Sequence, residues 1–341
     1  MSRQSRSVES PRRRIPDLRR TVLVLAALLL AIVADAAFAQ SKDYPDRTIK
    51  MLFGYPPGGG ADVIARLCAE SLHDGLHQPV IVENRAGATG NIAAQAAAHA
   101  APDGYTIFFG TAAEIAINKQ VMKDMGFDPD TDFVPVVLGF NVPLALVVST
   151  KSSYTSLAQL IDDAKRNPGK INYASSGSGT PGHLAGEMLA FRTGTRMTHV
   201  PYKGGGPALT DIIGGHVDFY FAALNSVLPH VKAGTLRVLA LSSAQRSPLV
   251  PEIPTVAELA APGFDFTIWG GVFAPVKTPP DIVMTLNRVV NEAYRRPEIK
   301  ARLNAESSEA TPNTPQQFAD FVKKEVAKYS QVVKEAGYTG Q

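Results

Sequence analysis

The sequence predicts an α/β protein of two lobes, in which helices flank a mainly parallel sheet in each lobe. Three observations predict it. Short apolar segments alternate with helix-like segments along the body, which is the pattern of parallel βαβ units. The 28 glycines and 25 prolines among 341 residues fall largely at the joints between those segments, where they favour tight turns. Finally, the chain stays extended at two places on either side of a complete βαβ set.

The expected elements follow from hydrophobic periodicity and from turn residues. In the first half we expect strands at 48–54, 80–83 and 106–109, separated by helices at 61–72 and 91–100. A helix at 156–167 starts with the N-cap Ser156 and stops at a Pro-Gly pair. Further strands are expected at 171–174, 198–202, 219–222 and 236–241, separated by helices that start near Gly182, Pro207 and Val227. The last helices are expected at 280–295 and 315–336.

The two extended stretches predict where the chain crosses between lobes. The first consists of strand-like runs at 134–140 and 144–149, separated by Asn141-Val142-Pro143, and the second covers 264–275. The first lobe would then contain residues 41–141 plus 266–341, and the second residues 142–265. The alternative is one continuous doubly wound sheet with a few irregular strands.

Residues 1–39 form an expected export signal. A basic, polar start is followed by 14 uncharged residues at 21–34 and by the small-x-small sequence Ala37-Phe38-Ala39, so we expect cleavage after Ala39 and a periplasmic protein. The alternative is a membrane anchor, but 14 helical residues rise about 21 Å, less than a hydrocarbon core of about 30 Å. The adjacent Arg19 and Arg20 leave Sec and twin-arginine export both open.

The charge balance excludes several partners. The whole chain has a net charge of +3, but the first 40 residues hold seven arginines against three acids, which leaves the rest at −1. A near-neutral body lacks the basic field that nucleic acids and anionic membrane surfaces require. The single cysteine, Cys68, excludes an intramolecular disulfide and a multi-thiolate metal site.

Three glycine-rich joints carry the functional information. They cover residues 54–62, 175–183 and 201–208, and each follows an expected strand and opens an expected helix. Glycine lets the backbone approach a ligand closely, and the first turn of a helix offers free N–H groups with a positive dipole end. In an open parallel sheet such joints share the carboxyl edge, where ligands bind. The joints therefore predict an anion site.

The sequence around the joints limits which anion it is. Gly177, Gly179 and Gly182 match G-x-G-x-x-G, but the acid that would hold a ribose is missing further on, and Lys203 precedes its glycines, so no P-loop is formed. There is no G-x-S-x-G around Ser178, no H-E-x-x-H and no metal-spaced cluster of His with acids, so we expect neither catalysis, nor a cofactor, nor a metal. A small carboxylate held by backbone N–H groups and hydroxyls fits best. The alternative is a secreted α/β hydrolase or transferase that uses Ser178 or His183.

Three polar side chains in the joints have two interpretations each. Asp62 either caps its helix or orients the first joint from behind, and a direct contact with an anion is disfavoured by repulsion. His183 either donates to the ligand or faces solvent in the first turn of its helix. Lys203 either neutralises the anion or is a solvated loop lysine.

The joints and several shorter motifs resemble the Bug family of extracytoplasmic solute receptors, which are the binding proteins of tripartite tricarboxylate transporters. The resemblance covers residues 44–338. Six motifs occur in order: YPPGGGADVIAR at 55–66, ENRAGATG at 83–90, PDGYT at 102–106, HLAGE at 183–187, VPYKG at 200–204 and LPHVKAG at 228–234.

The resemblance implies a two-lobed Venus-flytrap fold, like that of periplasmic binding proteins, that holds one small organic carboxylate in the cleft. The ligand contacts that it implies are Tyr55, Gly58, Gly59, Gly60, Thr111, Ala112, Ser176, Ser178, Thr180, Tyr202 and Lys203, with Asp62 and His183 in support. It also implies that the membrane components of a transporter are partners, and we expect a monomer. A receptor that reports to a sensor kinase would have the same sequence features. Many relatives carry an acid near Ala222-Ala223, and its absence here disfavours amino acids as ligands.

Overall fold

The computed structural model describes residues 44–335. Its nine strands are β1 (Ile49–Phe53), β2 (Val80–Asn84), β3 (Thr106–Thr111), β4 (Phe133–Ser149), β5 (Asn172–Ser175), β6 (Thr198–Pro201), β7 (Phe219–Ala223), β8 (Leu236–Leu241) and β9 (Thr267–Pro275). The α-helices are α2 (Gly60–Leu76), α3 (Asn91–Ala98), α4 (Asn118–Val121), α5 (Leu157–Arg166), α6 (Pro181–Thr193), α7 (Gly205–Gly214), α8 (Leu224–Lys232), α9 (Val256–Leu259), α10 (Pro280–Tyr294), α11 (Pro297–Ala305) and α12 (Pro315–Glu335). Short 3₁₀ and π turns occupy Ala88–Gly90 and Ala113–Ile117. The α/β fold class is confirmed.

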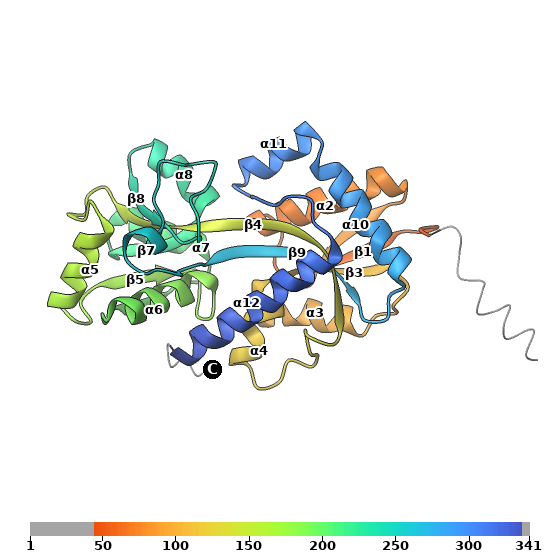
Figure 1. The fold of residues 1–341 in the computed structure, drawn as a ribbon, viewed down its shortest axis with the longest axis horizontal. Helices are drawn as coiled ribbons and strands as arrows, with labels where there is room; N and C mark the ends of the chain where they lie inside the picture. The colour runs from red at the N-terminus through yellow and green to blue at the C-terminus, as the bar shows by residue number, and fades with distance from the viewer. Residues whose placement is uncertain (1–43, 336–341) are drawn as a thin grey trace, which may run out of the picture. The chain divides into compact units, whose positions relative to one another are not determined.

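The strands form one curved sheet in the order β2-β1-β3-β9-β4-β7-β5-β6, with β8 paired to β4. The pairs of β1 with β2 and β3, and of β5 with β6 and β7, are parallel, as the βαβ pattern predicts. The other pairings, which involve β4 and β9, are antiparallel. The parallel sets place the ends of β1, β5, β6 and the helix starts that follow them toward the middle of the molecule (Figure 1).

The expected interruption at residues 141–143 is wrong. The chain instead forms the single 17-residue strand β4, and Asn141, Val142 and Pro143 pair with Trp269, Ile268 and Thr267 of β9. The long partner strand supplies the pairing, so one proline that lacks an N–H does not end the strand. Register shifts further upstream absorb the irregularity of the other proline, Pro135.

Strands β4 and β9 connect two groups of elements. The first part of β4 pairs with β9, which also pairs with β3, whereas the last part of β4 pairs with β7 and β8. The C-terminal helix α12 lies along this connection (Figure 1). Its Lys328 is 3.5 Å from Asp265, and its Glu325 accepts from the indole N–H of Trp269 in β9. The sequence alone did not indicate that α12 packs along the connecting strand.

Aromatic side chains fill the core beside β3. The rings of Phe108, Phe133, Phe273 and Phe318 have neighbouring centroids 5.0–6.5 Å apart and are almost completely buried. Buried aromatic surface of this size is a large source of stability for β3, β4, β9 and α12. Within residues 44–335, no helix combines the length and the apolar character that a bilayer span requires.

Candidate ligand-binding site

A cavity of about 540 Å³ lies where four helices begin. The helix starts are those of α2, α6, α7 and α8, and they contribute Gly60, Gly182, Gly205 and Asn225 to the wall. The first N–H groups of a helix have no partner within the helix and carry the positive end of its dipole. The cavity is therefore surrounded by four sources of positive potential that are not side chains.

The first glycine joint is held from behind by Asp62. Its carboxylate accepts from the Gly58 N–H at 3.0 Å, from the Arg66 guanidinium at 2.9 and 3.1 Å, and from the Asn84 amide at 2.8 Å. Asn84 also donates to the Tyr55 carbonyl at 2.9 Å. Burial alone raises the pKa of Asp62, but these hydrogen bonds outweigh burial and hold the pKa below its usual range. Asp62 therefore stays ionised and fixes the shape of the joint.

Tyr55 connects the cavity to a buried acid. Its hydroxyl is 3.4 Å from the Thr111 hydroxyl, and Thr111 donates both its N–H and its hydroxyl to Glu114. Burial raises the pKa of Glu114 to about 7, although the bonds from Thr111 oppose the shift. The other carboxylate oxygen, Oε1, is buried beside the backbone of Gly90 and has no hydrogen-bond partner within residues 44–335. Sequence reasoning missed Glu114 because it lies outside the glycine joints.

The second glycine joint is supported by two stacked histidines. His183 is buried, and its Nδ1 accepts from the Gly179 N–H at 3.1 Å. Its ring lies on that of His199, with centroids 3.9 Å apart, and His199 Nε2 is 2.6 Å from the fully buried Ser175 hydroxyl. Burial, followed by the charge of His183, lowers the pKa of His199 to about 4. His183 thus braces the joint from inside rather than facing solvent.

The third glycine joint contributes backbone and little side chain. The Gly204 N–H donates to the Ser176 carbonyl at 3.1 Å, which ties this joint to the second one. The Tyr202 hydroxyl donates to Asp211 at 2.6 Å, and Lys203 is exposed. Behind them, Tyr220 lines the cavity, and burial raises its pKa to about 12, so its hydroxyl remains a donor at neutral pH.

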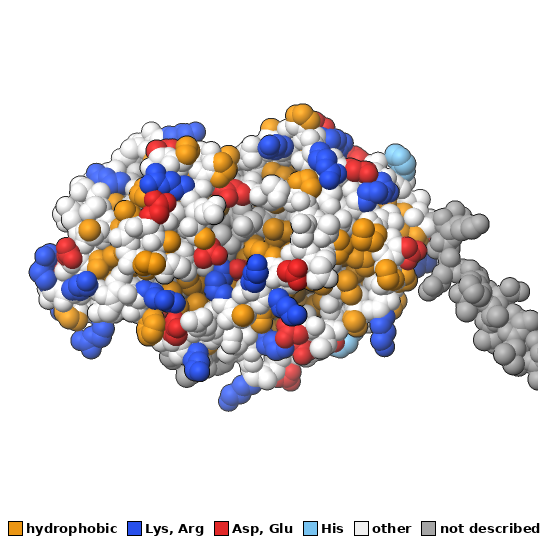
Figure 2. Space-filling view, viewed as in Figure 1, with side chains coloured by type: hydrophobic (Ala, Val, Ile, Leu, Met, Phe, Trp, Pro, Cys, Tyr) orange, Lys and Arg blue, Asp and Glu red, His pale blue; other side chains and the backbone are white. Residues whose placement is uncertain are grey.

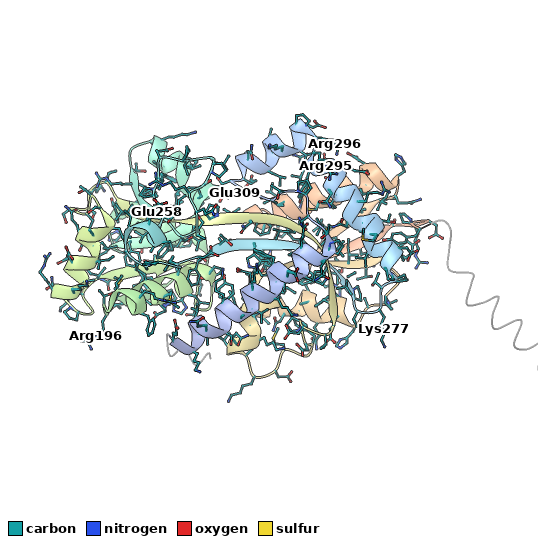
Figure 3. The ribbon with its side chains drawn as sticks, in the orientation of Figure 1. Arg196, Glu258, Lys277, Arg295, Arg296 and Glu309 are labelled. Atoms are coloured by element: carbon teal, nitrogen blue, oxygen red, sulfur yellow. The ribbon has the colours of Figure 1, made fainter. Side chains whose placement is uncertain are left out.

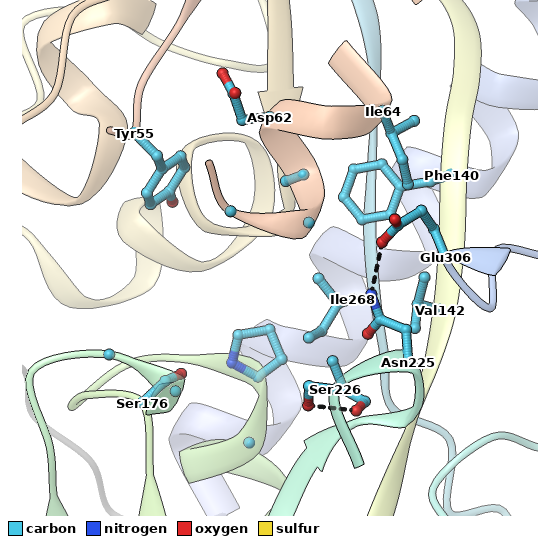
Figure 4. Close-up of a pocket in the computed structure, with 18 of the residues that line it drawn as sticks. Tyr55, Asp62, Ile64, Phe140, Val142, Ser176, Asn225, Ser226, Ile268 and Glu306 are labelled. Atoms are coloured by element: carbon cyan, nitrogen blue, oxygen red, sulfur yellow. Dashed lines mark hydrogen bonds between the residues drawn. The ribbon is translucent and has the colours of Figure 1, made fainter. Parts of the chain in front are cut away.

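The start of α8 gives the cavity a fourth helix end that the sequence did not place at the site. The helix expected near Val227 begins at Leu224, directly after β7, and no glycine precedes it, so the glycine signal was absent. Asn225 and Ser226 of α8 line the cavity, and the Asn225 amide donates to Glu306, just after α11, at 2.9 Å (Figure 4). Residues 222–223 are alanines, but the cavity still has an acid here, because Glu306 reaches it from another part of the chain.

The structure brings only some of the predicted contacts to the cavity wall. Tyr55, Gly59, Gly60 and Ser176 line it, as does Asp62. Gly58, Thr111, Ala112, Ser178, Thr180, Tyr202 and Lys203 are not among the lining residues, although Thr111 lies directly behind Tyr55. The Thr180 hydroxyl donates to the Gly177 carbonyl at 2.7 Å and Ser178 is exposed. Their contact with a ligand stays a prediction.

The charges around the cavity are arranged unusually for an anion site. Among the described lining residues there is no lysine, arginine or histidine, and the two charged ones are Asp62 and Glu306. Lysines and arginines are instead interspersed with acids over the outer surface, as Figure 2 shows for one face, and labelled examples such as Arg196 and Lys277 lie at the periphery in Figure 3. In residues 44–335 no cluster of three potential metal ligands occurs.

Comparison with known proteins identifies the family. Residues 64–338 match the model of the tripartite tricarboxylate transporter family receptor. The chain belongs to this family. It is 38% identical to BugT of Bordetella pertussis, over 93% of this chain and 97% of that protein. The structure of R. palustris Rpa4515 with adipate superposes with a TM-score of 0.79 at 37% identity, covering 86% of this chain and 99% of the other. The structure of MatC (Rpa3494) from Rhodopseudomonas palustris with bound malate superposes with a TM-score of 0.74 at 30% identity, and the match covers 85% of this chain and 100% of the other. The chain is thus a solute receptor of the tripartite tricarboxylate transporter type, and the predicted fold and family are confirmed.

Proposed function

We propose that this receptor captures a small organic carboxylate in the cavity and delivers it to the membrane components of a tripartite transporter. One observation carries the proposal. Four helix N-termini meet at a cavity whose described lining includes no cationic side chain. Backbone N–H groups and hydroxyls at helix starts suit a carboxylate, because its oxygens are acceptors that gain from the dipole. Two similar proteins carry adipate and malate in their structures, which supports the same ligand chemistry here.

Capture would proceed by closure of two lobes. The lobes are residues 41–141 plus 266–341 and residues 142–265, joined where β4 and β9 pass between them. Tyr55, Gly59 and Gly60 would come from the first lobe and Ser176 from the second, with Gly58, Thr111, Ala112, Ser178, Thr180, Tyr202 and Lys203 joining them on closure. A ligand that contacts both lobes stabilises the closed form by its difference in affinity for the two forms.

An enzymatic role is disfavoured. Ser178 is the exposed serine of the second joint, and the nearby His183 accepts from the Gly179 N–H instead. The serine that does contact a histidine is Ser175, and it is fully buried, so it cannot reach a substrate. His183 is occupied in bracing the joint. We therefore propose a binding protein without turnover, acting as a monomer.

The proposed location is the periplasm. Receptors of this family work outside the cytoplasm, and residues 1–39 have the composition of a cleavable export signal, although they lie outside the described residues. Amino-terminal sequencing of the exported protein should return Gln40 first. An intact Met1 would contradict the cleavage.

A thermal-shift screen of the purified protein tests the function. Mono- and dicarboxylates, aromatic acids and their uncharged amides would be compared at equal concentration. We expect at least one carboxylate to raise the midpoint temperature of unfolding, because a ligand that binds the folded state stabilises it by RT ln(1 + [L]/Kd). The amide of that carboxylate should have little effect. Equal shifts from acid and amide, or no shift from any acid, would contradict carboxylate capture.

A further inference from the structure

The cavity has two chemically different ends. In Figure 4, Tyr55 and Ser176 lie on one side, and Phe140, Asn225 and Glu306 lie on the other. The first end offers hydroxyls together with the start of α7, which suit a carboxylate, whereas Gly60 at the start of α2 lies beside Asn225 and Glu306. The second end has a carboxylate of its own. A ligand that reaches both ends must therefore carry different groups at its two ends.

The second end presents hydrogen-bond acceptors. The Asn225 amide nitrogen donates to Glu306 Oε2 at 2.9 Å, which turns its oxygen, Oδ1, away from Glu306. That oxygen is too deeply buried for a ligand group in the cavity to reach it. Asn225 therefore orients Glu306, whose carboxylate lines the cavity and favours a hydrogen-bond donor over a second anion.

The surface around this end is apolar. Ile64, Phe140, Val142, Leu144 and Ile268 line the cavity, and of these only Ile268 is more than slightly exposed. No lysine or arginine lines the cavity in the described structure, so a second carboxylate at this end would gain no cation, and the starts of α2 and α8 that lie here already have the Glu306 carboxylate beside them. It would also face Glu306, and like charges at short range repel.

We infer that the solute of this receptor is a monocarboxylate whose apolar body ends in a hydrogen-bond donor, such as a hydroxyl group, and that Glu306 with Asn225 selects that end. The inference rests on the proposed function, because it assumes that the carboxylate binds between Tyr55, Ser176 and the helix starts. It assigns to Glu306 the rejection of dicarboxylates.

A structural role for the same pair has a different signature. Asn225 starts α8 and Glu306 follows α11, so their hydrogen bond also joins two distant elements. If the pair only held these elements together, loss of Glu306 would change the affinity for every ligand by the same factor. If Glu306 instead selects the distal group of the ligand, its loss would change the affinity by a different factor for each ligand.

Isothermal titration of the purified protein with matched solutes separates these cases. One set is 6-hydroxyhexanoate, hexanoate and adipate, and a rigid set is 4-hydroxybenzoate, benzoate and terephthalate. Within the set that fits, we expect the hydroxy acid to bind about 5-fold more tightly than the plain acid, and the dicarboxylate at least about 10-fold more weakly than the hydroxy acid.

Glu306→Gln is the decisive variant, with Glu298→Gln, whose side chain is 65% exposed on α11, as the matched control. In Glu306→Gln the dicarboxylate should gain about 10-fold while the plain acid changes less than about 2-fold, and the control should leave all affinities unchanged. A wild-type dicarboxylate affinity equal to that of the hydroxy acid, or a uniform change in Glu306→Gln, would overturn the inference and leave the proposed function intact. If another carboxylate bound in the thermal-shift screen but none of the six solutes did, the inference would fall and the proposed function would stand.

Discussion

The first and second glycine joints bring backbone N–H groups to the same cavity but are braced by opposite means. Behind the first, the ionised Asp62 accepts from Gly58, Arg66 and Asn84. Behind the second, the imidazole of His183 accepts from Gly179 and stacks on the neutral His199. Hydrogen bonds keep Asp62 ionised, whereas burial keeps His199 neutral. The two joints should therefore fail under different conditions.

The largest expected effect comes from blocking the first joint itself. Gly59→Val puts a side chain where nothing lies within 4 Å of an added Cβ, so the fold should be kept while the approach of a ligand to the start of α2 is closed. We expect at least about a 100-fold loss of carboxylate affinity by titration. Thermal melting of Gly59→Val, which should match that of the wild type, is the control for folding. Unchanged affinity in folded Gly59→Val would remove the first joint from the site.

The acid behind Tyr55 should make the first-joint region pH-dependent. The folded-state pKa of Glu114, about 7, lies above its unfolded value, so the folded state binds more protons and stability falls as pH rises from about 4.5 to 7. The fall attributable to Glu114 is about 3 kcal/mol. Urea unfolding across this range should show it in the wild type and not in Glu114→Gln. An identical slope in both proteins would exclude Glu114 as its source.

Removing the charge of the first brace should cost less. Asp62→Asn keeps one acceptor for the Gly58 N–H but loses the ionic partner of Arg66, whose side chain is about half exposed. We expect a loss of about 1–3 kcal/mol in the free energy of unfolding, together with weaker ligand binding. Calorimetry and titration on the same samples measure both. Full stability and affinity would show that Asp62 does not hold the joint.

The support that His199 gives to the second glycine joint should weaken as the pH falls. The folded-state pKa of His199, about 4, lies below its unfolded value of about 6.5, so its contribution is complete above pH 6.5 and is lost as pH falls toward 4. Between pH 6.5 and 4, the free energy of unfolding should fall by about 1–2 kcal/mol more in the wild type than in His199→Gln. The slope has the opposite sign to that of Glu114. A variant with the wild-type slope would contradict the neutral brace.

The smallest effect is expected at the third joint. Lys203 is exposed and outside the cavity wall, so Lys203→Ala should reduce carboxylate affinity by no more than about 5-fold, and the difference should shrink in 0.5 M salt. Titration at two salt concentrations checks this. A loss as large as that in Gly59→Val would mean that a cation, rather than helix starts, attracts the ligand.

The sequence predicted the features that depend on local pattern. Glycines after strands located the starts of α2, α6 and α7, and the strand–helix alternation predicted the parallel sets. It could not predict what depends on pairing over long distance. Pro143 reads as a break, yet β9 keeps it within β4. The start of α8 has no glycine, and Glu306 reaches the cavity from α11, whose helix was not expected. Which side chains face the cavity was therefore only partly predictable.

The most direct test of the account is a crystal structure of the protein with its tightest-binding carboxylate. We expect the carboxylate oxygens to lie within hydrogen-bond reach, directly or through one water, of backbone N–H groups at the starts of α2 and α7, with no lysine or arginine nitrogen within about 4 Å. A carboxylate paired with a lysine or arginine side chain, or bound away from these helix starts, would contradict the claim that the backbone supplies the positive potential.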